Sequence, residues 1–180
     1  YSHFPGMEQN HIRDWYLRKI NNCTGELIIQ NPYINDEKFW DELSKIDPAR
    51  AKRIKIINPY KAKGNDYVQD ESSIKCRVYE PLKNGISFYA YKWRMTHWKI
   101  ALDVDSSEVM VGSYNLNYRS ALHDFEMNVL IESKDLSSQV RKMLLQDMEQ
   151  SELITEAGEF FKHPKLHARC LLLDTIEYFE

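Results

Sequence analysis

Short hydrophobic runs alternate with amphipathic stretches along most of the chain. Some stretches repeat apolar residues at the spacing of a helix, and some short runs are rich in the β-branched and aromatic residues that favour strands. The pattern predicts helices at 8–22, 36–45 and 135–150 and strands at 27–30, 54–57 and 86–91. This alternation predicts an α/β fold, and we find no internal repeat or low-complexity segment.

Three further strands are predicted in the second half of the chain. Residues 97–103 read HWKIALD, an alternating run that would place His97, Lys99 and Ala101 on one face. Residues 108–112 (EVMVG) would pair with it through a tight turn, and 125–131 (FEMNVLI) would form a third strand. We therefore expect polar groups of these strand ends to converge at one rim of the sheet.

Those polar groups suit phosphodiester chemistry. Lys99 can neutralise phosphoryl oxygens, and Ser113 and Asn115 can add neutral hydrogen bonds. Neutral His97 can attack phosphorus near pH 7 because the ordinary pKa of imidazole is about 6.5. Glu126 is the candidate carboxylate that fixes the imidazole tautomer. The leaving alkoxide still needs a general acid, for which a second histidine is the best candidate.

Residues 97–133 resemble the H-x-K-x4-D-x6-G-S-x-N motif of the phospholipase D superfamily. Residues 112–120 (GSYNLNYRS) resemble its phosphatidyltransferase branch, which includes the cardiolipin synthases, in having an arginine-serine pair after the turn. Upstream strands and loops, roughly from residue 10, resemble the second catalytic half of such enzymes. The resemblance implies a mixed β-sheet flanked by helices on both faces. The catalytic lobe would span 1–155, with an N-terminal helix region at 1–23.

The resemblance also implies an activity. It is that of a phosphatidyltransferase or phospholipase D, which acts on phospholipid at a membrane surface through a covalent phosphohistidine, with no metal or other cofactor. His97, Lys99, Ser113, Asn115 and Glu126 would be the catalytic residues, and which motif histidine is the nucleophile stays open.

Two neighbouring residues are candidates for substrate contacts. Arg119 could bind a phosphate, but it could equally form a salt bridge that holds the following helix. Tyr114 could line a substrate channel, but aromatic residues beside a motif more often pack in the core.

The chain departs from the family pattern in two ways. Five residues, not four, separate Lys99 from Asp105, and Asp103 comes one position early, so either aspartate could fill the acidic position. The family site contains two motifs, whereas this chain has one complete copy. The second copy would come from a missing N-terminal half or from the partner in a homodimer.

The C-terminal segment 156–180 has no clear role. Its sequence LHARCLLLD is close to the same motif, with an arginine in place of the lysine, but no glycine-serine-x-asparagine turn follows. His167 is therefore either incidental or part of a degenerate second motif.

Composition limits the other classes of function. The net charge of −3 provides no overall basic field, which counts against nucleic acid as a partner. A homodimeric, metal-independent endonuclease and a non-catalytic scaffold lobe remain the alternatives. No apolar run is long enough to span a bilayer and no signal peptide opens the chain, so we expect a cytoplasmic or peripheral membrane protein.

Three scattered cysteines, Cys23, Cys76 and Cys170, predict free thiols in a reducing compartment. His163, His167 and Cys170 have ligand-like spacing, but Pro164 interrupts them and a fourth ligand is missing, so we do not expect a metal site.

Overall fold

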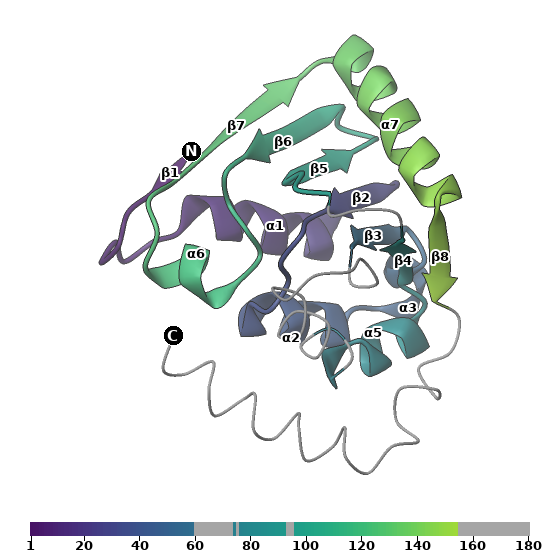
Figure 1. Cartoon of the computed structure of the whole chain (residues 1–180), viewed down its shortest axis with the longest axis horizontal. Helices are drawn as coiled ribbons and strands as arrows, with labels where there is room; N and C mark the ends of the chain where they lie inside the picture. The colour runs from purple at the N-terminus through teal and green to yellow at the C-terminus, as the bar shows by residue number, and fades with distance from the viewer. Residues whose placement is uncertain (60–73, 75, 93–95, 155–180) are drawn as a thin grey trace.

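The computed structural model describes residues 1–59, 74, 76–92 and 96–154. Its centre is a mixed sheet with the strand order β1-β7-β6-β5-β2-β3-β4-β8 (Figure 1). The strands are β1 (Ser2–His3), β2 (Leu27–Gln30), β3 (Ile54–Asn58), β4 (Ser87–Tyr91), β5 (Ile100–Asp103), β6 (Glu108–Gly112), β7 (Glu126–Glu132) and β8 (Ser151–Ile154). The helices are α1 (His11–Asn22), α2 (Glu37–Lys45), α3 (Pro48–Ala51), α5 (Tyr79–Asn84), α6 (Tyr118–Leu122) and α7 (Lys134–Glu149).

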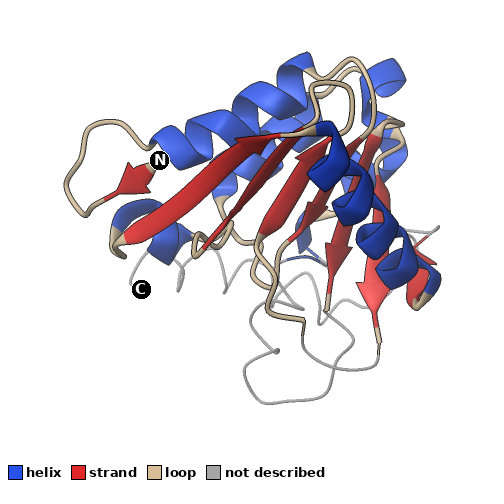
Figure 2. Cartoon of the chain, turned by 90° about the horizontal axis from the view of Figure 1, so that it is seen from above, coloured by secondary structure: helices blue, strands red, loops and turns tan. Residues whose placement is uncertain are grey.

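Helices cover both faces of this sheet, which confirms the predicted fold (Figure 2). On one face, α1 and α2 bury Trp15 and Trp40 against the strands. On the other face, α7 buries Leu144. Successive residues of a strand point to opposite faces, so the neighbours Ile28 and Ile29 of β2 belong to different core clusters. Because both faces of the central strands are buried, all four residues of β2 are buried and its first three are apolar.

Most of the elements predicted from periodicity are confirmed. The strand predicted at 108–112 coincides with β6, and the predicted helices correspond to α1, α2 and α7 with ends shifted by a few residues. The elements missed by the sequence are β1, α3, α5, α6 and β8. All five contain six residues or fewer, and none has the apolar run or the alternation by which the equally short central strands were predicted. The segment 156–180 lies outside the described residues.

The strand predicted at 97–103 begins only at Ile100, so this prediction is wrong for its first three residues. Ile100 pairs with Gln30, the last residue of β2, and with Val111 near the end of β6. Beyond that point β2 provides no further pairing residue for His97 and Lys99. These two residues therefore lie in the segment that leads into β5, at the rim of the sheet.

Cys76 is disulfide-bonded, so the prediction that all three cysteines are free is wrong. Cys23 is a buried free thiol. Because disulfides persist mainly in oxidising compartments, the argument for a reducing compartment also loses its basis. The predicted ligand-like cluster of His163, His167 and Cys170 lies outside the described residues. In the part of the chain that the structure describes, no helix is both long and apolar enough to cross a bilayer.

The two aspartates that compete for the acidic motif position have different surroundings. Asp103 is buried and pairs with Lys19 at 2.6 Å, and Lys19 also pairs with Glu108 at 2.9 Å. Burial alone would raise the pKa of Asp103, but hydrogen bonds from Lys19 and Ser106 and the lysine charge hold it below its usual value. Asp105 is exposed and accepts a hydrogen bond from Thr24. Asp103 therefore links α1 to the β5–β6 hairpin.

We expect Asp103→Asn to lower the free energy of unfolding by about 2 kcal/mol, because it leaves the Lys19 ammonium with one carboxylate fewer in a largely buried site. Asp105→Asn is the matched control and should cost less than about 1 kcal/mol, because the side chain is exposed. Urea unfolding followed by fluorescence measures both. Equal losses would show that the buried ion pair does not hold the hairpin.

Candidate active site

The predicted site residues lie at the rim where β5 begins, β6 ends and β7 begins. The backbone N–H of Gly112 donates to the carbonyl of Lys99 at 3.3 Å, which joins the end of β6 to the start of β5. The backbone N–H of Ser113 donates to the carbonyl of Met127 at 3.1 Å, which joins the same loop to β7. Three chain segments that carry the motif therefore meet at one place.

His97 and Lys99 are in direct contact. The Lys99 ammonium lies 3.0 Å from Nδ1 and 2.9 Å from Nε2 of His97, and it also donates to the His97 carbonyl at 3.2 Å. The rings of His97 and Tyr33 are nearly perpendicular, with 6.2 Å between ring centres. His97 is exposed, whereas only 6% of Lys99 is accessible. The His97 imidazole is thus open to solvent and lies against a buried cation.

Burial and charge shift the pKa values of both groups downward. Desolvation lowers the pKa of His97 below 6.5, and the neighbouring Lys99 charge lowers it further. The imidazole is therefore neutral at pH 7, which leaves a ring nitrogen free to attack. Desolvation also lowers the pKa of Lys99 to about 8, although the Glu126 carboxylate opposes that shift. Glu126 is thus close enough to act on Lys99 electrostatically.

Glu126 is buried at the start of β7 and accepts hydrogen bonds on both oxygens. The hydroxyl of Ser113 donates to Oε2 and the hydroxyl of Ser120 donates to Oε1. The Ser120 hydroxyl also accepts from the backbone N–H of Asn115 at 3.3 Å. Hydrogen bonds therefore connect Glu126 to Ser113 and, through Ser120, to the backbone of Asn115. Lys99 contacts His97 and is affected by the Glu126 charge, so the five predicted residues gather at this rim.

One predicted contact is absent from this arrangement. Glu126 was the candidate partner of the His97 imidazole, but its oxygens bond to serine hydroxyls, and His97 contacts Lys99 instead. Ser120, fully buried at the start of α6, is a site residue that the sequence analysis missed. The signal for it was present, because Ser120 is the serine of the arginine-serine pair in GSYNLNYRS.

Gly112 is required by the close approach of β6 to β7. A Cβ at this position would lie 2.2 Å from both the Asn128 side-chain oxygen and the Met127 carbonyl. Residues with a side chain would push the strands apart and move Ser113 away from Glu126. The glycine of the motif therefore sets the distance between the loop and the carboxylate.

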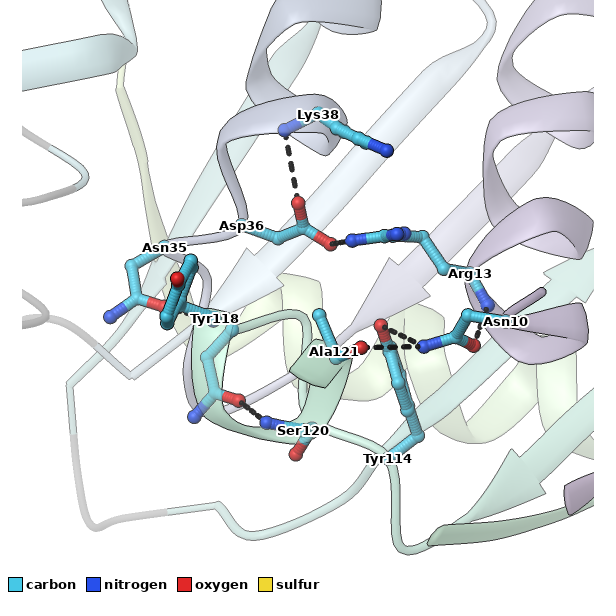
Figure 3. A network of polar contacts seen from close by, with 10 residues as sticks. Asn10, Arg13, Asn35, Asp36, Lys38, Tyr114, Tyr118, Ser120 and Ala121 are labelled. Carbon is cyan, nitrogen blue, oxygen red and sulfur yellow. Dashed lines mark hydrogen bonds and ion pairs between the residues drawn. The ribbon is translucent and has the colours of Figure 1, made fainter. Parts of the chain in front are cut away.

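Tyr114 is a core anchor and does not line a substrate channel. Its side chain is fully buried and stacks on Tyr16, with 6.4 Å between ring centres. Its hydroxyl accepts from Asn10 at 3.4 Å, and Asn10 also donates to the Ala121 carbonyl (Figure 3). Desolvation raises the pKa of the Tyr114 phenol above its usual range. Of the two alternatives predicted for Tyr114, the structure shows packing in the core.

A buried polar network connects the loop between β6 and α6 to α1 and to the segment before α2 (Figure 3). Asp36 caps α2 through the backbone N–H of Lys38 and lies 3.8 Å from the Arg13 guanidinium. Burial raises the pKa of Asp36, and the Arg13 charge opposes the shift. Asn35 accepts from the backbone N–H of Tyr118 at 3.0 Å, so the same segment fixes the start of α6.

A second polar contact fixes the backbone at His97. The side chain of Gln30, fully buried at the end of β2, donates to the Thr96 hydroxyl at 3.2 Å and to Asp147 of α7 at 2.9 Å. Thr96 directly precedes His97. The residue that precedes His97 is thus linked through Gln30 to both the central strand and the helix on the far face of the sheet.

Arg119 adopts the salt-bridge alternative. It is exposed, and its Nε lies 3.0 Å from a carboxylate oxygen of Asp124. The side-chain oxygen of Asn115, in contrast, is buried without a hydrogen-bond partner, which leaves it available to an added donor. Within residues 1–59, 74, 76–92 and 96–154, no group of three or more His, Cys, Asp or Glu side chains could hold a metal ion.

Comparison with known proteins identifies the family. Residues 16–148 match the family model described as cardiolipin synthase, PLD-like domain, and the chain belongs to this family. It is 26% identical to cardiolipin synthase 1 of Staphylococcus epidermidis over 165 residues, and 30% identical to cardiolipin synthase A of Pseudomonas putida over 152 residues. Each alignment covers 84% of this chain but only 30% and 31% of the relatives, so the chain spans less than a third of their length.

Solved structures show the same fold. Phosphatidylserine synthase of Haemophilus influenzae superposes with a TM-score of 0.73 at 18% identity, over 98% of this chain and 46% of that chain. Nuc, a phospholipase D family member from Salmonella typhimurium, superposes with a TM-score of 0.66 at 16% identity, over 87% of this chain and 99% of that chain. The resemblance inferred from the motif is confirmed.

Proposed function

We propose that this chain is a catalytic lobe of a phosphatidyltransferase or phospholipase D that cleaves phospholipid phosphodiesters through a covalent phosphohistidine, without a metal. The observation that carries the proposal is the contact between the exposed, neutral His97 imidazole and the buried Lys99 ammonium, beside the Glu126 carboxylate and its two serine donors. The names of the cardiolipin synthase relatives support phospholipid as the substrate class.

In the first half-reaction, a ring nitrogen of His97 forms a bond to phosphorus and the bond from phosphorus to the leaving alkoxide breaks. Lys99 offsets the negative charge that develops on the phosphoryl oxygens, and Ser113 and Asn115 add hydrogen bonds. A second histidine gives its proton to the alkoxide, which leaves as an alcohol. In the second half-reaction the same histidine removes a proton from an acceptor alcohol or water, whose oxygen then displaces His97 from phosphorus.

The environment of Glu126 favours a site completed by a second motif. A carboxylate offers about four acceptor positions, of which the Ser113 and Ser120 hydroxyls occupy two. We infer that a remaining position receives the Nδ1–H of the histidine that the second motif supplies.

Exposed apolar residues provide a surface for that second lobe. Phe125, Met127 and Val129 flank Glu126 along β7 and are 75%, 67% and 52% exposed. Contiguous apolar surface of this kind marks an interaction site. The second lobe is either another half of a longer chain or a second copy of this one.

The direct test is incubation of the chain with phosphatidylglycerol vesicles and EDTA, followed by mass spectrometry of the lipids. We expect cardiolipin if an alcohol of a second lipid resolves the intermediate, and phosphatidic acid if water does. A parallel incubation with single-stranded and double-stranded DNA covers the endonuclease alternative. EDTA-resistant DNA cleavage without any lipid product would replace the proposed function with that one. Loss of lipid product on addition of EDTA would refute metal independence.

A further inference from the structure

His3 is a buried histidine that the proposed chemistry does not use. It belongs to β1, a two-residue strand outside the motif, and only 2% of it is accessible to solvent. Neither Nδ1 nor Nε2 makes a hydrogen bond of normal geometry in the described structure, although the Ala121 carbonyl acts on the ring. A buried polar group without a partner costs about 1–3 kcal/mol, and such groups call for an explanation.

The sheet places this imidazole beside Glu126. β1 pairs antiparallel with β7, and the register sets His3 directly opposite Glu126. Residues opposite each other in an antiparallel pair point to the same face and have Cβ atoms about 4.5–5.5 Å apart. The 7% exposure of Glu126 shows that this face is the buried one. Hydrogen bonds between the backbone of Asn128 and Tyr1 continue the pairing and fix the register.

Three elements surround the His3 ring. The Arg13 guanidinium of α1, the Ala121 carbonyl of α6 and the Glu126 carboxylate of β7 are the groups that act on its charge. Desolvation is the largest cause that lowers the pKa of His3, and Arg13 adds to it, whereas Ala121 and Glu126 oppose the shift. The ring is therefore neutral at pH 7, with one N–H to donate and one nitrogen that can accept.

We propose that His3 is a positioning residue for Glu126, to which it donates an imidazole N–H from the neighbouring strand. The inference rests on the proposed role of Glu126. The two serine hydroxyls leave acceptor positions on the carboxylate, so an imidazole N–H can be a third donor. Because His3 is buried, it cannot reach the phosphodiester itself, and it acts through Glu126.

The first part of the test does not depend on turnover. The pH titration of the histidine rings is followed by NMR in the ¹⁵N-labelled chain, with the His3 signal identified by its loss in His3→Phe. Replacement of Glu126 by Gln removes a charge that favours protonated His3. We expect it to lower the apparent pKa of His3 further, by about one unit. Ser2→Ala, on the opposite face of β1, is the control and should leave the titration unchanged. An unaltered His3 titration in Glu126→Gln would overturn the inference.

The second part measures kinetics on the lipid substrate. His3→Phe keeps a ring of similar size but loses the donor, so we expect kcat to fall about 10- to 100-fold, as for other groups that orient a site residue. KM should stay within about twofold, and the acid limb of the pH profile should move. His3→Gln retains an N–H donor and should recover much of the rate, and it also serves if His3→Phe does not fold. A change in thermal stability alone, with kcat and the pH profile intact, would contradict the inference.

The two parts separate this inference from the proposed function. A chain that converts no phosphodiester, yet shows the Glu126-dependent titration of His3, refutes the proposed function and supports the proposed interaction between His3 and Glu126. A chain that turns over lipid, but in which Glu126→Gln leaves the His3 titration unchanged, supports the proposed function and refutes the role of His3.

Discussion

Replacement of His97 by alanine will reduce turnover of phosphatidylglycerol by at least about 10⁴-fold, the order found when a covalent nucleophile is removed. His97 requires its imidazole in either role, because one histidine must attack phosphorus and another must protonate the leaving alkoxide. The side chain is exposed, so the free energy of unfolding should change by less than about 0.5 kcal/mol.

Trp98→Ala is the matched control, because Trp98 is adjacent and 51% exposed but offers no nucleophile. Its kcat should stay within about threefold of the wild-type value. Mass spectrometry of peptides from rapidly quenched reactions then locates the phosphatidyl adduct. An adduct on His97 identifies the nucleophile, whereas an adduct on a histidine of a second motif assigns His97 the role of general acid. Full activity in His97→Ala would refute the proposed chemistry.

Lys99→Met will lower kcat/KM by about 10²- to 10³-fold, the cost of removing one group that stabilises charge in the transition state. The buried ammonium is replaced by an apolar chain of similar length, so folding should be preserved. Lys92→Met is the control. Lys92 lies in an exposed ion pair with Glu152 at 2.9 Å, and its loss should leave the rate nearly unchanged.

The pH dependence of kcat/KM is an independent test of the role of the Lys99 charge. The pKa of Lys99 is lowered to about 8, and kcat/KM reports the free enzyme. Activity should therefore decline as the pH rises through about 8, where Lys99 loses its charge. In Lys99→Arg, which remains charged, that alkaline limb should disappear even though the rate is lower. An alkaline limb that persists unchanged in Lys99→Arg would show that another group controls it.

The sequence predicted the larger part of the fold because the long elements carry a clear hydrophobic period. α1, α2 and α7 bury one side each, and the central strands β2 and β3 are mostly apolar. The short elements could not be predicted in the same way. β8 contains four residues, two of them polar, and it becomes a strand only because β4 offers it a free edge. α6 contains five residues and is defined by its cap, in which Asn117 accepts from the backbone N–H of Ser120.

The candidate site, like the fold, could be predicted from the sequence only in part. The residue types in the motif identified His97, Lys99, Ser113, Asn115 and Glu126, and their spacing indicated that strand ends bring them together. The partners of these residues could not be read from spacing, because a hydrogen bond depends on side-chain direction. Glu126 bonds to Ser113 and Ser120, and Tyr114 turns into the core toward Tyr16.

The sequence by itself determined the fold class, the family and the five motif residues, because periodicity and residue type are local properties of the chain. Only the tertiary structure decided which contacts those residues make. It buried Asp103 against Lys19 and left Asp105 exposed, and it set His3 opposite Glu126, a residue 123 positions away, through the register of β1 and β7. Such pairings arise from strand register and burial, which no local pattern encodes.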